Sequence, residues 1–314
     1  MNNLLIIDAH CDVITKIMET SEELYANNCH FDLKRLKKYD QFVQFFAAYV
    51  DPQYSPNNAY SRCMDIIKNF EIQVEKNKEH IIFAKEYKHI TDAIAHGKVA
   101  AVLTIENGSA LEGDIKNLDK FYELGVRSIG LTWNGSNQIA CGVGGDNLPG
   151  GLTQFGIHVV KRMNELGMLV DVSHINEASF WDVIGISTAP IIASHSNSKT
   201  ICPHRRNLTD DQFRALIKNG GVAGINLCPP FLNASGTANI NDILRHIEHF
   251  MSLGGEDNIG MGADLDGIVN TPTDVPGVEY MGDIFDALLQ ANYTEEQIRK
   301  IAGLNFLRVL KEVI

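Results

Sequence analysis

Leu4-Leu5-Ile6-Ile7-Asp8-Ala9-His10-Cys11-Asp12 is the stretch from which both the fold and the site are predicted. Its four consecutive aliphatic residues, 4–7, are typical of a strand that is buried on both faces, as in a parallel sheet. His10 and Asp12 follow this run, and residues two apart in an extended segment point to the same side. A neutral imidazole and a carboxylate on one side suit a divalent metal ion such as zinc. Taken alone, the pair is more often two loop side chains that contact only water.

The overall composition is that of a globular protein. The 314 residues are 45% hydrophobic, which is ample for a large core, and no apolar run reaches the length of a membrane span. The net charge of −12 argues against nucleic acid and against an anionic membrane as main partners, and ordinary solubility explains it. The N-terminus leads into the first run without a basic region or a cleavage site. We therefore expect a cytoplasmic protein with no membrane and no nucleic-acid partner.

The cysteines point to the same compartment. None of the six forms a C-x-x-C pair, and the chain is too long to be a disulfide scaffold, so reduced thiols are expected. They are Cys11, Cys29, Cys63, Cys141, Cys202 and Cys228. The C-terminal segment 307–312 predicts an amphipathic helix rather than a lipid-anchor signal.

Apolar runs alternate with helical patterns along the whole chain. Eight runs are predicted as strands: 4–8, 42–48, 99–105, 127–132, 168–172, 190–194, 222–226 and 259–263. Helical spacing and capping residues predict helices over 62–77, 152–166, 209–219, 240–253 and 294–313. Eight such units in this length predict a single domain, a (β/α)8 TIM barrel over residues 1–314. A doubly wound open sheet is the alternative, but no Gly-rich dinucleotide turn follows the first run.

The residues that follow these runs carry the chemistry, because a barrel places its active site at the C-terminal ends of its strands. Metal-binding or polar side chains stand at six of these ends: His10 with Asp12, Glu106, Trp133 with Asn134, His174, His195, and Asp264 with Asp266. Three long connections, 134–151, 228–239 and 267–280, follow the same ends, and the first is predicted to be a lid or substrate loop. Any one residue could be a hydrogen-bonded loop or core side chain. The whole set at one end favours a site for two metal ions.

The other histidines are predicted to lie on the surface: His30, His80, His89, His96, His158, His204, His246 and His249. His246 and His249 are three residues apart in a predicted helix and could bind a metal. Because no Glu stands between them in an H-E-x-x-H pattern, a solvated helix face is the favoured interpretation.

With these residues in place, the chain resembles the zinc-dependent membrane dipeptidases, the renal dipeptidase family. The resemblance runs in the family's order from residue 8 to residue 267. Its pieces are Asp8-Ala9-His10-Cys11-Asp12, Glu106-Asn107-Gly108, Leu131-Thr132, Asp171-Val172-Ser173-His174, Ser194-His195-Ser196, Arg205-Arg206-Asn207 and Gly262-Ala263-Asp264-Leu265-Asp266-Gly267.

The resemblance implies a binuclear zinc site, with two Zn²⁺ per chain, in a (β/α)8 barrel. By position, it implies that His10 and Asp12 bind one metal, that His174 and His195 bind the other, that Glu106 bridges them, that Arg206 grips the substrate's C-terminal carboxylate, and that Asp264 moves protons. No lysine ends the third or fourth run, so the sequence itself also favours glutamate over a carbamylated lysine as the bridge. Manganese, cobalt or iron could also fit this mixed donor set.

Two departures from the family pattern matter. Trp133 stands where the mammalian members have a histidine after Leu-Thr, and that histidine helps to hold the oxyanion in the family. Its role would pass to Asn134, to Asn137 or to a metal alone, which puts the substrate range in question more than the reaction type. The mammalian secretion signal and lipid anchor are also missing from this sequence, so attachment to a membrane is not implied.

The leading hypothesis is therefore a metallo-dipeptidase, an exopeptidase that acts on small free dipeptides. The alternatives are a related amidohydrolase for N-acyl amino acids, lactams or lactones, which Trp133 motivates, and a metal-dependent binding protein without turnover. Glu106 and Asp264 argue against the last, because a binding module needs no proton shuttle. Asp266 is expected either to hydrogen-bond to a residue that binds the metal or to be a structural loop acid. Arg205 is expected to form surface ion pairs. The oligomeric state stays open, with a homodimer as one option.

Overall fold

The stretch from Leu5 to Cys11 forms strand β1, and all seven of its residues are buried. The computed structural model describes residues 3–144 and 150–314. The strand continues three residues beyond the predicted run, so that His10 lies within β1 rather than after it. Asp12 is the N-cap of the next helix, α1 (Val13–Thr20). The two side chains are therefore fixed by a strand end and a helix start, not by a loop.

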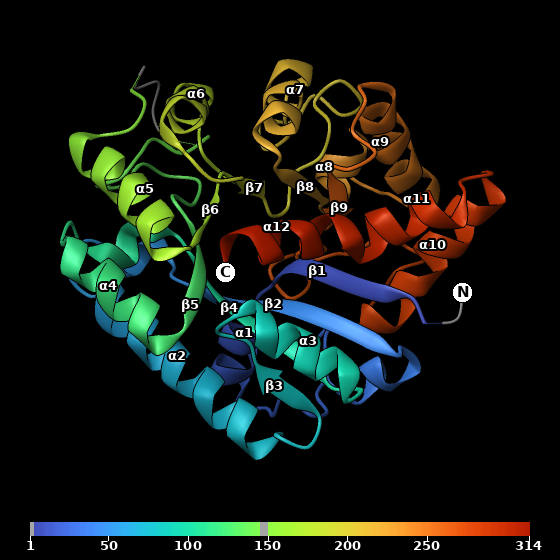
Figure 1. Cartoon of the computed structure of the whole chain (residues 1–314), viewed down its shortest axis with the longest axis horizontal. Helices are drawn as coiled ribbons and strands as arrows, with labels where there is room; N and C mark the ends of the chain where they lie inside the picture. Colours follow the sequence, from blue (N-terminus) through green and yellow to red (C-terminus); the bar gives the residue numbers. More distant parts are fainter. Residues whose placement is uncertain (1–2, 145–149) are drawn as a thin grey trace.

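Eight parallel strands close into a barrel, with the helices arranged around it (Figure 1). Strand β1 pairs with β2 (Gln41–Tyr49) on one side and with β9 (Ile259–Met261) on the other. The others are β4 (Val99–Glu106), β5 (Val126–Gly130), β6 (Leu169–Asp171), β7 (Ile192–Ala193) and β8 (Val222–Ile225). The ring closes where β2 pairs with β4, in register from Val43–Ala100 to Tyr49–Glu106. The closure confirms the (β/α)8 barrel and excludes the open sheet.

A ninth strand, β3 (Ile81–Phe83), was not among the eight predicted. It pairs with the first residues of β4, from Val99 to Ala101, whereas β5 pairs with β4 from Leu103 onwards. The two therefore share one edge of β4, because β2 occupies the other edge. The short strand extends the sheet at the N-terminal end of the barrel and does not interrupt the ring.

Helices follow most strands and form the outer layer. They are α2 (Ala59–Lys76), α3 (Tyr87–Ala95), α4 (Ile115–Leu124), α5 (Gln154–Leu166), α6 (Glu177–Ile186), α7 (Asp210–Asn219), α8 (Pro229–Leu232), α9 (Ile240–Ser252), α10 (Met281–Gln290), α11 (Glu295–Arg299) and α12 (Asn305–Val313). Thr209 and Thr294 begin α7 and α11 with reciprocal capping boxes. The helix predicted over 294–313 is divided by a π-helical turn, Lys300–Leu304, which packs on β1 so closely that a Cβ on Gly303 would lie 2.7 Å from the Leu5 carbonyl oxygen.

A compact apolar cluster joins alternate strand residues to α12. Val43 and Phe45 of β2, together with Ala100 and Val102 of β4, belong to it with Phe306, Val309 and Leu310 of the helix. The Phe45 and Phe306 rings lie 6.1 Å apart between centroids. Glu106 shares the face of β4 that carries Ala100 and Val102, because side chains alternate along a strand. The helix therefore packs toward one end of the strands, and Glu106 faces the other end.

The long connections carry short elements of their own. Residues 228–239 contain α8, and 267–280 contain a 3-10 turn, Val278–Tyr280. Residues 145–149 of the 134–151 connection lie outside the described residues, so its predicted role as a lid stays a prediction. Within the described ranges, no helix combines the length and apolarity needed to cross a bilayer.

Candidate metal centre and active site

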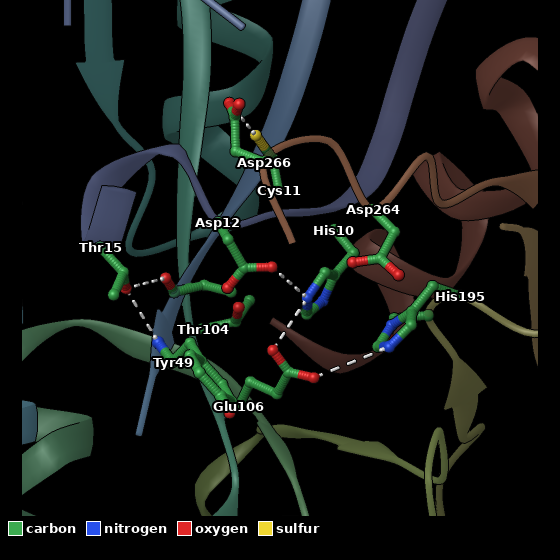
Figure 2. A network of polar contacts seen from close by, with 12 residues as sticks. His10, Cys11, Asp12, Thr15, Tyr49, Thr104, Glu106, His195, Asp264 and Asp266 are labelled. Carbon is green, nitrogen blue, oxygen red and sulfur yellow. Dashed lines mark hydrogen bonds and ion pairs between the residues drawn. The ribbon is translucent and has the colours of Figure 1, made fainter. Parts of the chain in front are cut away.

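Glu106 is the last residue of β4, and its two carboxylate oxygens face different histidines. Oε2 lies 3.2 Å from Nε2 of His10, and Oε1 lies 3.0 Å from Nε2 of His174 and 3.8 Å from Nε2 of His195. Figure 2 shows one oxygen of this carboxylate directed toward His10 and the other toward His195. A carboxylate in this position can bridge two cations, because each oxygen serves one of them.

His10, Asp12 and Glu106 form the first group of donors. Nε2 of His10 lies 3.3 Å from Oδ2 of Asp12, and all three side chains are buried. Among the described residues, Oδ1 of Asp12 is buried without any hydrogen-bond partner. A buried carboxylate oxygen without a donor is costly, and a metal ion would satisfy it.

Glu106, His174 and His195 form the second group, and the two groups share the glutamate. Their candidate ligand atoms all lie within 4.8 Å of one another, as do those of the first group. The two histidine Nε2 atoms are 2.9 Å apart. Imidazole nitrogens and carboxylate oxygens that converge in this way are the donor set of zinc and of related divalent metals. The residues therefore fit two ions, one in each group.

Burial and close charged neighbours shift the pKa values of the cluster. Burial and the neighbouring Glu106 raise the pKa of Asp12 to about 7. Burial alone would raise the pKa of Glu106 as well, but His10 and His174 lower it below its usual range. Burial, with Arg206 nearby, lowers the pKa of His174 to about 3, so this imidazole is neutral. His10 differs: burial alone would lower its pKa, but Glu106 and Asp12 raise the pKa of His10 well above its ordinary value. A metal ion bound to this imidazole would therefore displace a proton, because a ligating histidine must be neutral.

Asp264 extends the centre from the segment after β9. Its carboxylate groups with His10 and His195, and its Oδ2 accepts a hydrogen bond of 2.9 Å from the Asn226 side chain. Burial raises the pKa of Asp264 to about 6. A Cβ on Gly267 would collide with Oδ2 of Asp12 and Oδ1 of Asp264, so the chain must have glycine there for both carboxylates to keep their places.

Three residues in the segments that follow β6 and β9 have left-handed backbone conformations that non-glycine residues rarely adopt. They are His174 (φ 71°), Asp264 (φ 59°) and Asp266 (φ 68°). Each stands just after a strand, where the chain turns to aim its side chain. Such strained positions tend to gather at functional sites.

A cavity of about 640 Å³ opens over the metal-binding groups. Its wall includes Glu106, Trp133, Asp264 and Arg206. The guanidinium of Arg206 is buried, donates from Nη2 to the His195 carbonyl oxygen at 3.2 Å, and forms no salt bridge with any described residue. Burial lowers the pKa of Arg206, but a guanidinium remains charged in proteins. A buried cation on a cavity wall can bind an anionic group.

Trp133 and Asn134 were both predicted to contact substrate. Both border the cavity, but their side chains have different neighbours. The Trp133 ring lies between Tyr49 (5.6 Å between centroids) and His174 (6.0 Å) on the cavity wall. The Asn134 side-chain oxygen accepts a hydrogen bond of 2.9 Å from Nδ1 of His174, so it orients that ring. Asn137 is unavailable for an oxyanion, because its amide group bonds to Leu131, Ile139 and Ala140 of its own loop.

Asp266 and Arg205 lie apart from the metal-binding groups. Asp266 accepts from the backbone N–H groups of His30 and Phe31 at 2.6 and 3.2 Å, which makes it a structural loop acid, and Figure 2 shows it turned toward Cys11. Arg205 is exposed.

The prediction of a solvated His246 was wrong. The side chain is fully buried; its Nδ1 accepts from Ser198 N–H at 3.1 Å, and its Nε2 donates to the Leu232 carbonyl at 3.0 Å. His249 instead contacts Asp210, with Nε2 2.8 Å from the carboxylate oxygen.

Sequence reasoning missed residues that hold the ligands in place. Asn226 is the last residue of the seventh predicted run, 222–226, and supports Asp264, so the same strand-end rule could have found it. Asp171 and Ser194 were noted only as neighbours of the two histidines, although both reach His195 through hydrogen bonds. Asp171 lies inside an apolar run, which hid its role.

The fold and the centre define a metal-dependent hydrolase on a (β/α)8 barrel, with room for a small substrate above two groups of ligands. The sequence model of the membrane dipeptidase family, Peptidase family M19, matches residues 1–314. The chain belongs to this family and is a metallo-dipeptidase.

Relatives and solved structures agree with this assignment. An uncharacterised dipeptidase of Schizosaccharomyces pombe is 32% identical over 300 residues, which cover 90% of this chain and 72% of that protein. The crystal structure of a dipeptidase of family M19 superposes with a TM-score of 0.92 at 26% identity, over 99% of each chain. A metallopeptidase from Rhodobacter sphaeroides, liganded with a phosphinate mimic of the dipeptide L-Ala-D-Ala, gives 0.91 at 25% identity over 100% of each chain.

Proposed function

We propose that this chain hydrolyses the peptide bond of free dipeptides with two bound divalent metal ions, natively zinc. The observation that carries the proposal is the position of Glu106, whose two oxygens face different histidine groups. In this proposal His10 and Asp12 hold one ion, His174 and His195 hold the other, and Glu106 contacts both. The dipeptide mimic bound by the Rhodobacter sphaeroides metallopeptidase supports the substrate class.

The chain's own residues prepare the substrate for attack by water. Metal ions held by these residues would lower the pKa of a bound water from about 15.7 towards 7 and would polarise the scissile carbonyl. Asp264 lies beside both metal-binding groups, and its Oδ2 is held by Asn226. Its carboxylate takes the proton that the attacking water loses and delivers it to the departing amine.

Arg206 selects substrates with a free C-terminal carboxylate. It is buried on the cavity wall without a carboxylate partner among the described residues, and a planar guanidinium matches a carboxylate with two parallel hydrogen bonds. A substrate anchored there by its C-terminal carboxylate would be cleaved next to its C-terminal residue, which accounts for an exopeptidase.

Metal analysis and a substrate panel on one preparation test the proposal. We expect about two zinc ions per chain and hydrolysis of unblocked dipeptides, with slow turnover of the same dipeptides when the C-terminus is amidated. One bound metal per chain, or equal rates for free and amidated substrates, would contradict it. Apo-protein reloaded with manganese or cobalt serves to compare metals.

A second candidate substrate class is favoured by Trp133, which stands in the cavity wall beside His174. With indole in place of the imidazole of the mammalian family members, the site offers less help to the oxyanion of an amide. Lactones, lactams and N-acyl amino acids then become competing substrates. Relative kcat/KM values for a dipeptide, an N-acyl amino acid and a lactone decide between the two classes.

We also propose a reducing, cytoplasmic location. All six cysteines are free thiols, and Cys11, Cys63 and Cys202 are buried. Reduced buried thiols are typical of proteins that fold in the cytosol. Localisation of the tagged full-length protein by cell fractionation tests this point.

A further inference from the structure

Behind His195 lies a buried chain of hydrogen bonds that ends on a carboxylate. The Ser194 hydroxyl lies 2.7 Å from Nδ1 of His195 and 2.5 Å from Oδ2 of Asp171. The other carboxylate oxygen, Oδ1, accepts from the backbone N–H groups of Ser173 and Ser194, both at 2.9 Å. All of these side chains are buried. These hydrogen bonds connect the end of β6 to the end of β7.

The direction of these hydrogen bonds is fixed by the number of protons. A serine hydroxyl has one hydrogen, and a carboxylate can only accept. Since Oδ2 of Asp171 and the hydroxyl oxygen are 2.5 Å apart, that hydrogen must point to Asp171. The hydroxyl oxygen must then accept from His195, which places the imidazole hydrogen on Nδ1. Nε2 is left with its lone pair aimed at Glu106 and His174.

His174 is held in a different way. Its Nδ1 donates to the amide oxygen of Asn134, a neutral group on a loop that also borders the cavity. His195 donates instead to a hydroxyl that is polarised by a buried negative charge, and charge-assisted hydrogen bonds are the stronger kind. The two histidines of one metal-binding group therefore differ in how firmly their protons and ring orientations are set.

We propose that Asp171 is a positioning residue of the metal centre, which acts through Ser194 to fix the Nδ1–H form of His195 and to strengthen Nε2 as a metal ligand. The inference rests on the proposed metal site of His174 and His195. Partners of this kind behind a ligating histidine fix its orientation and raise its basicity. Asp171 and Ser194 touch neither substrate nor metal in this arrangement.

Two substitutions should weaken metal binding at His195 to different degrees. Ser194→Ala removes the link and leaves His195 free to adopt either proton position. Asp171→Asn keeps an oxygen for the two backbone N–H groups but presents an NH₂ group to Ser194. The hydroxyl then accepts from the amide and donates to Nδ1, which moves the imidazole hydrogen to Nε2 and blocks that nitrogen as a ligand. We expect Asp171→Asn to be the more damaging change, although it is the closer match in shape.

The test is cobalt titration of the apo-protein, followed by visible absorption and by competition with a chelator. In the natural protein we expect two binding events. Ser194→Ala should weaken one of them by on the order of 10- to 100-fold and leave the other unchanged, and Asp171→Asn should weaken the same one further. Ser194→Thr, which keeps the hydroxyl, should restore the affinity and the spectrum.

Ser128→Ala is the matched control, because it also removes a buried hydroxyl. That hydroxyl donates a hydrogen bond of 3.1 Å to the Leu169 carbonyl and does not contact the metal-binding groups. Its two affinities should stay unchanged. Natural affinity and spectrum in Ser194→Ala, or equal weakening of both events in all variants, would overturn the inference while leaving the proposed function intact. Fewer than two cobalt ions bound by the natural protein would instead contradict the proposed function itself. Circular dichroism establishes that each variant is folded, and if Asp171→Asn is not, Ser194→Ala and Ser194→Thr decide alone.

Discussion

Glu106 is the register partner of Tyr49 in the strand pair that closes the barrel. The residue that faces both histidine groups thus sits at the seam between β2 and β4. A slip of one residue in that pairing would turn Glu106 to the opposite face of β4, because side chains alternate along a strand. Closure of the barrel and assembly of the metal centre are therefore a single structural event.

Replacement of Glu106 by Gln should remove at least one of the two metal ions. An amide offers one oxygen and no charge, so it cannot serve both groups. We expect loss of metal and a fall in kcat/KM of more than about 100-fold. Elemental analysis and dipeptide hydrolysis measure both effects. Glu123→Gln, at an exposed position of α4, is the control and should keep both ions; two tightly held ions in Glu106→Gln would exclude the bridging role.

Replacement of Arg206 by Lys should impair binding of free dipeptides even though the charge remains. Lysine is a point charge and lacks the planar fork that matches a carboxylate. We expect a loss of about 2–4 kcal/mol in kcat/KM for the free dipeptide and little change for its amide. Arg214→Lys, at an exposed position of α7 outside the cavity wall, is the matched control and should behave like the natural protein. If Arg206→Lys still preferred the free acid to the same degree, another cation would have to bind the carboxylate.

Replacement of Gly267 by Ala should disturb the centre without removing any ligand. The new methyl group would collide with Oδ2 of Asp12 and Oδ1 of Asp264. We expect weaker metal binding and a fall in kcat of about 10-fold or more, because carboxylates displaced by about 1 Å lose catalytic geometry. Gly185→Ala is the control, since a Cβ there meets nothing within 4 Å. Unchanged metal affinity and kcat would mean that the segment after β9 moves to accommodate the methyl group without displacing the carboxylates of Asp12 and Asp264.

Replacement of Trp133 by His should shift the substrate range toward dipeptides. The substitution supplies an imidazole beside His174 on the cavity wall and leaves every proposed ligand in place. We expect the ratio of kcat/KM values, dipeptide over lactone, to rise about 10-fold, or roughly 1.4 kcal/mol. Metal content should not change. Trp181→His on α6 is the control for loss of an indole at a partly exposed site. A ratio that stays constant would remove Trp133 from the determinants of specificity.

His246 should make the fold less stable in mild acid. Burial lowers its pKa to about 4, below the ordinary value near 6.5 that applies to the unfolded chain. Between these two pH values the unfolded state binds more protons, so the free energy of unfolding falls as the pH falls through this window. The full effect is about 3 kcal/mol between pH 7 and pH 4.

Urea unfolding of His246→Gln at pH 7.5 and pH 4.5, with the metal concentration held constant, measures this effect. The variant should be less stable than the natural protein at pH 7.5 but should lose less stability on acidification. His158→Gln, at an exposed position of α5, should show the full natural loss. An equal loss in His246→Gln would show that this histidine does not contribute to the acid sensitivity.

The fold was predictable because parallel strands are buried on both faces and read as continuous apolar runs. All eight barrel strands lie where such runs occur. The three-residue strand β3 escaped notice, because Ile81–Phe83 is too short to stand out from the helices beside it. The π-helical turn at 300–304 was equally hidden, since its sequence continues the helical pattern and only packing against β1 explains it.

The candidate site was predictable where one rule sufficed, namely that polar residues after barrel strands meet at one mouth. It pointed to His10, Asp12, Glu106, His174, His195 and Asp264, whose candidate ligand atoms form three overlapping groups, each within 4.8 Å. It could not show that Asn134 contacts His174, because that contact depends on the path of a loop. Nor could it show that His246 is buried, because the absence of a metal motif says nothing about which helix face packs inward.

Asn134 contributes both to the cavity and to the proposed metal site. It belongs to the loop that borders the cavity, and its amide oxygen orients the ring of His174. A loop exchanged to admit a bulkier substrate would therefore alter how long the ion at that histidine stays bound. A redesign for a new substrate should therefore replace this loop only from Gly135 onward and should keep Asn134.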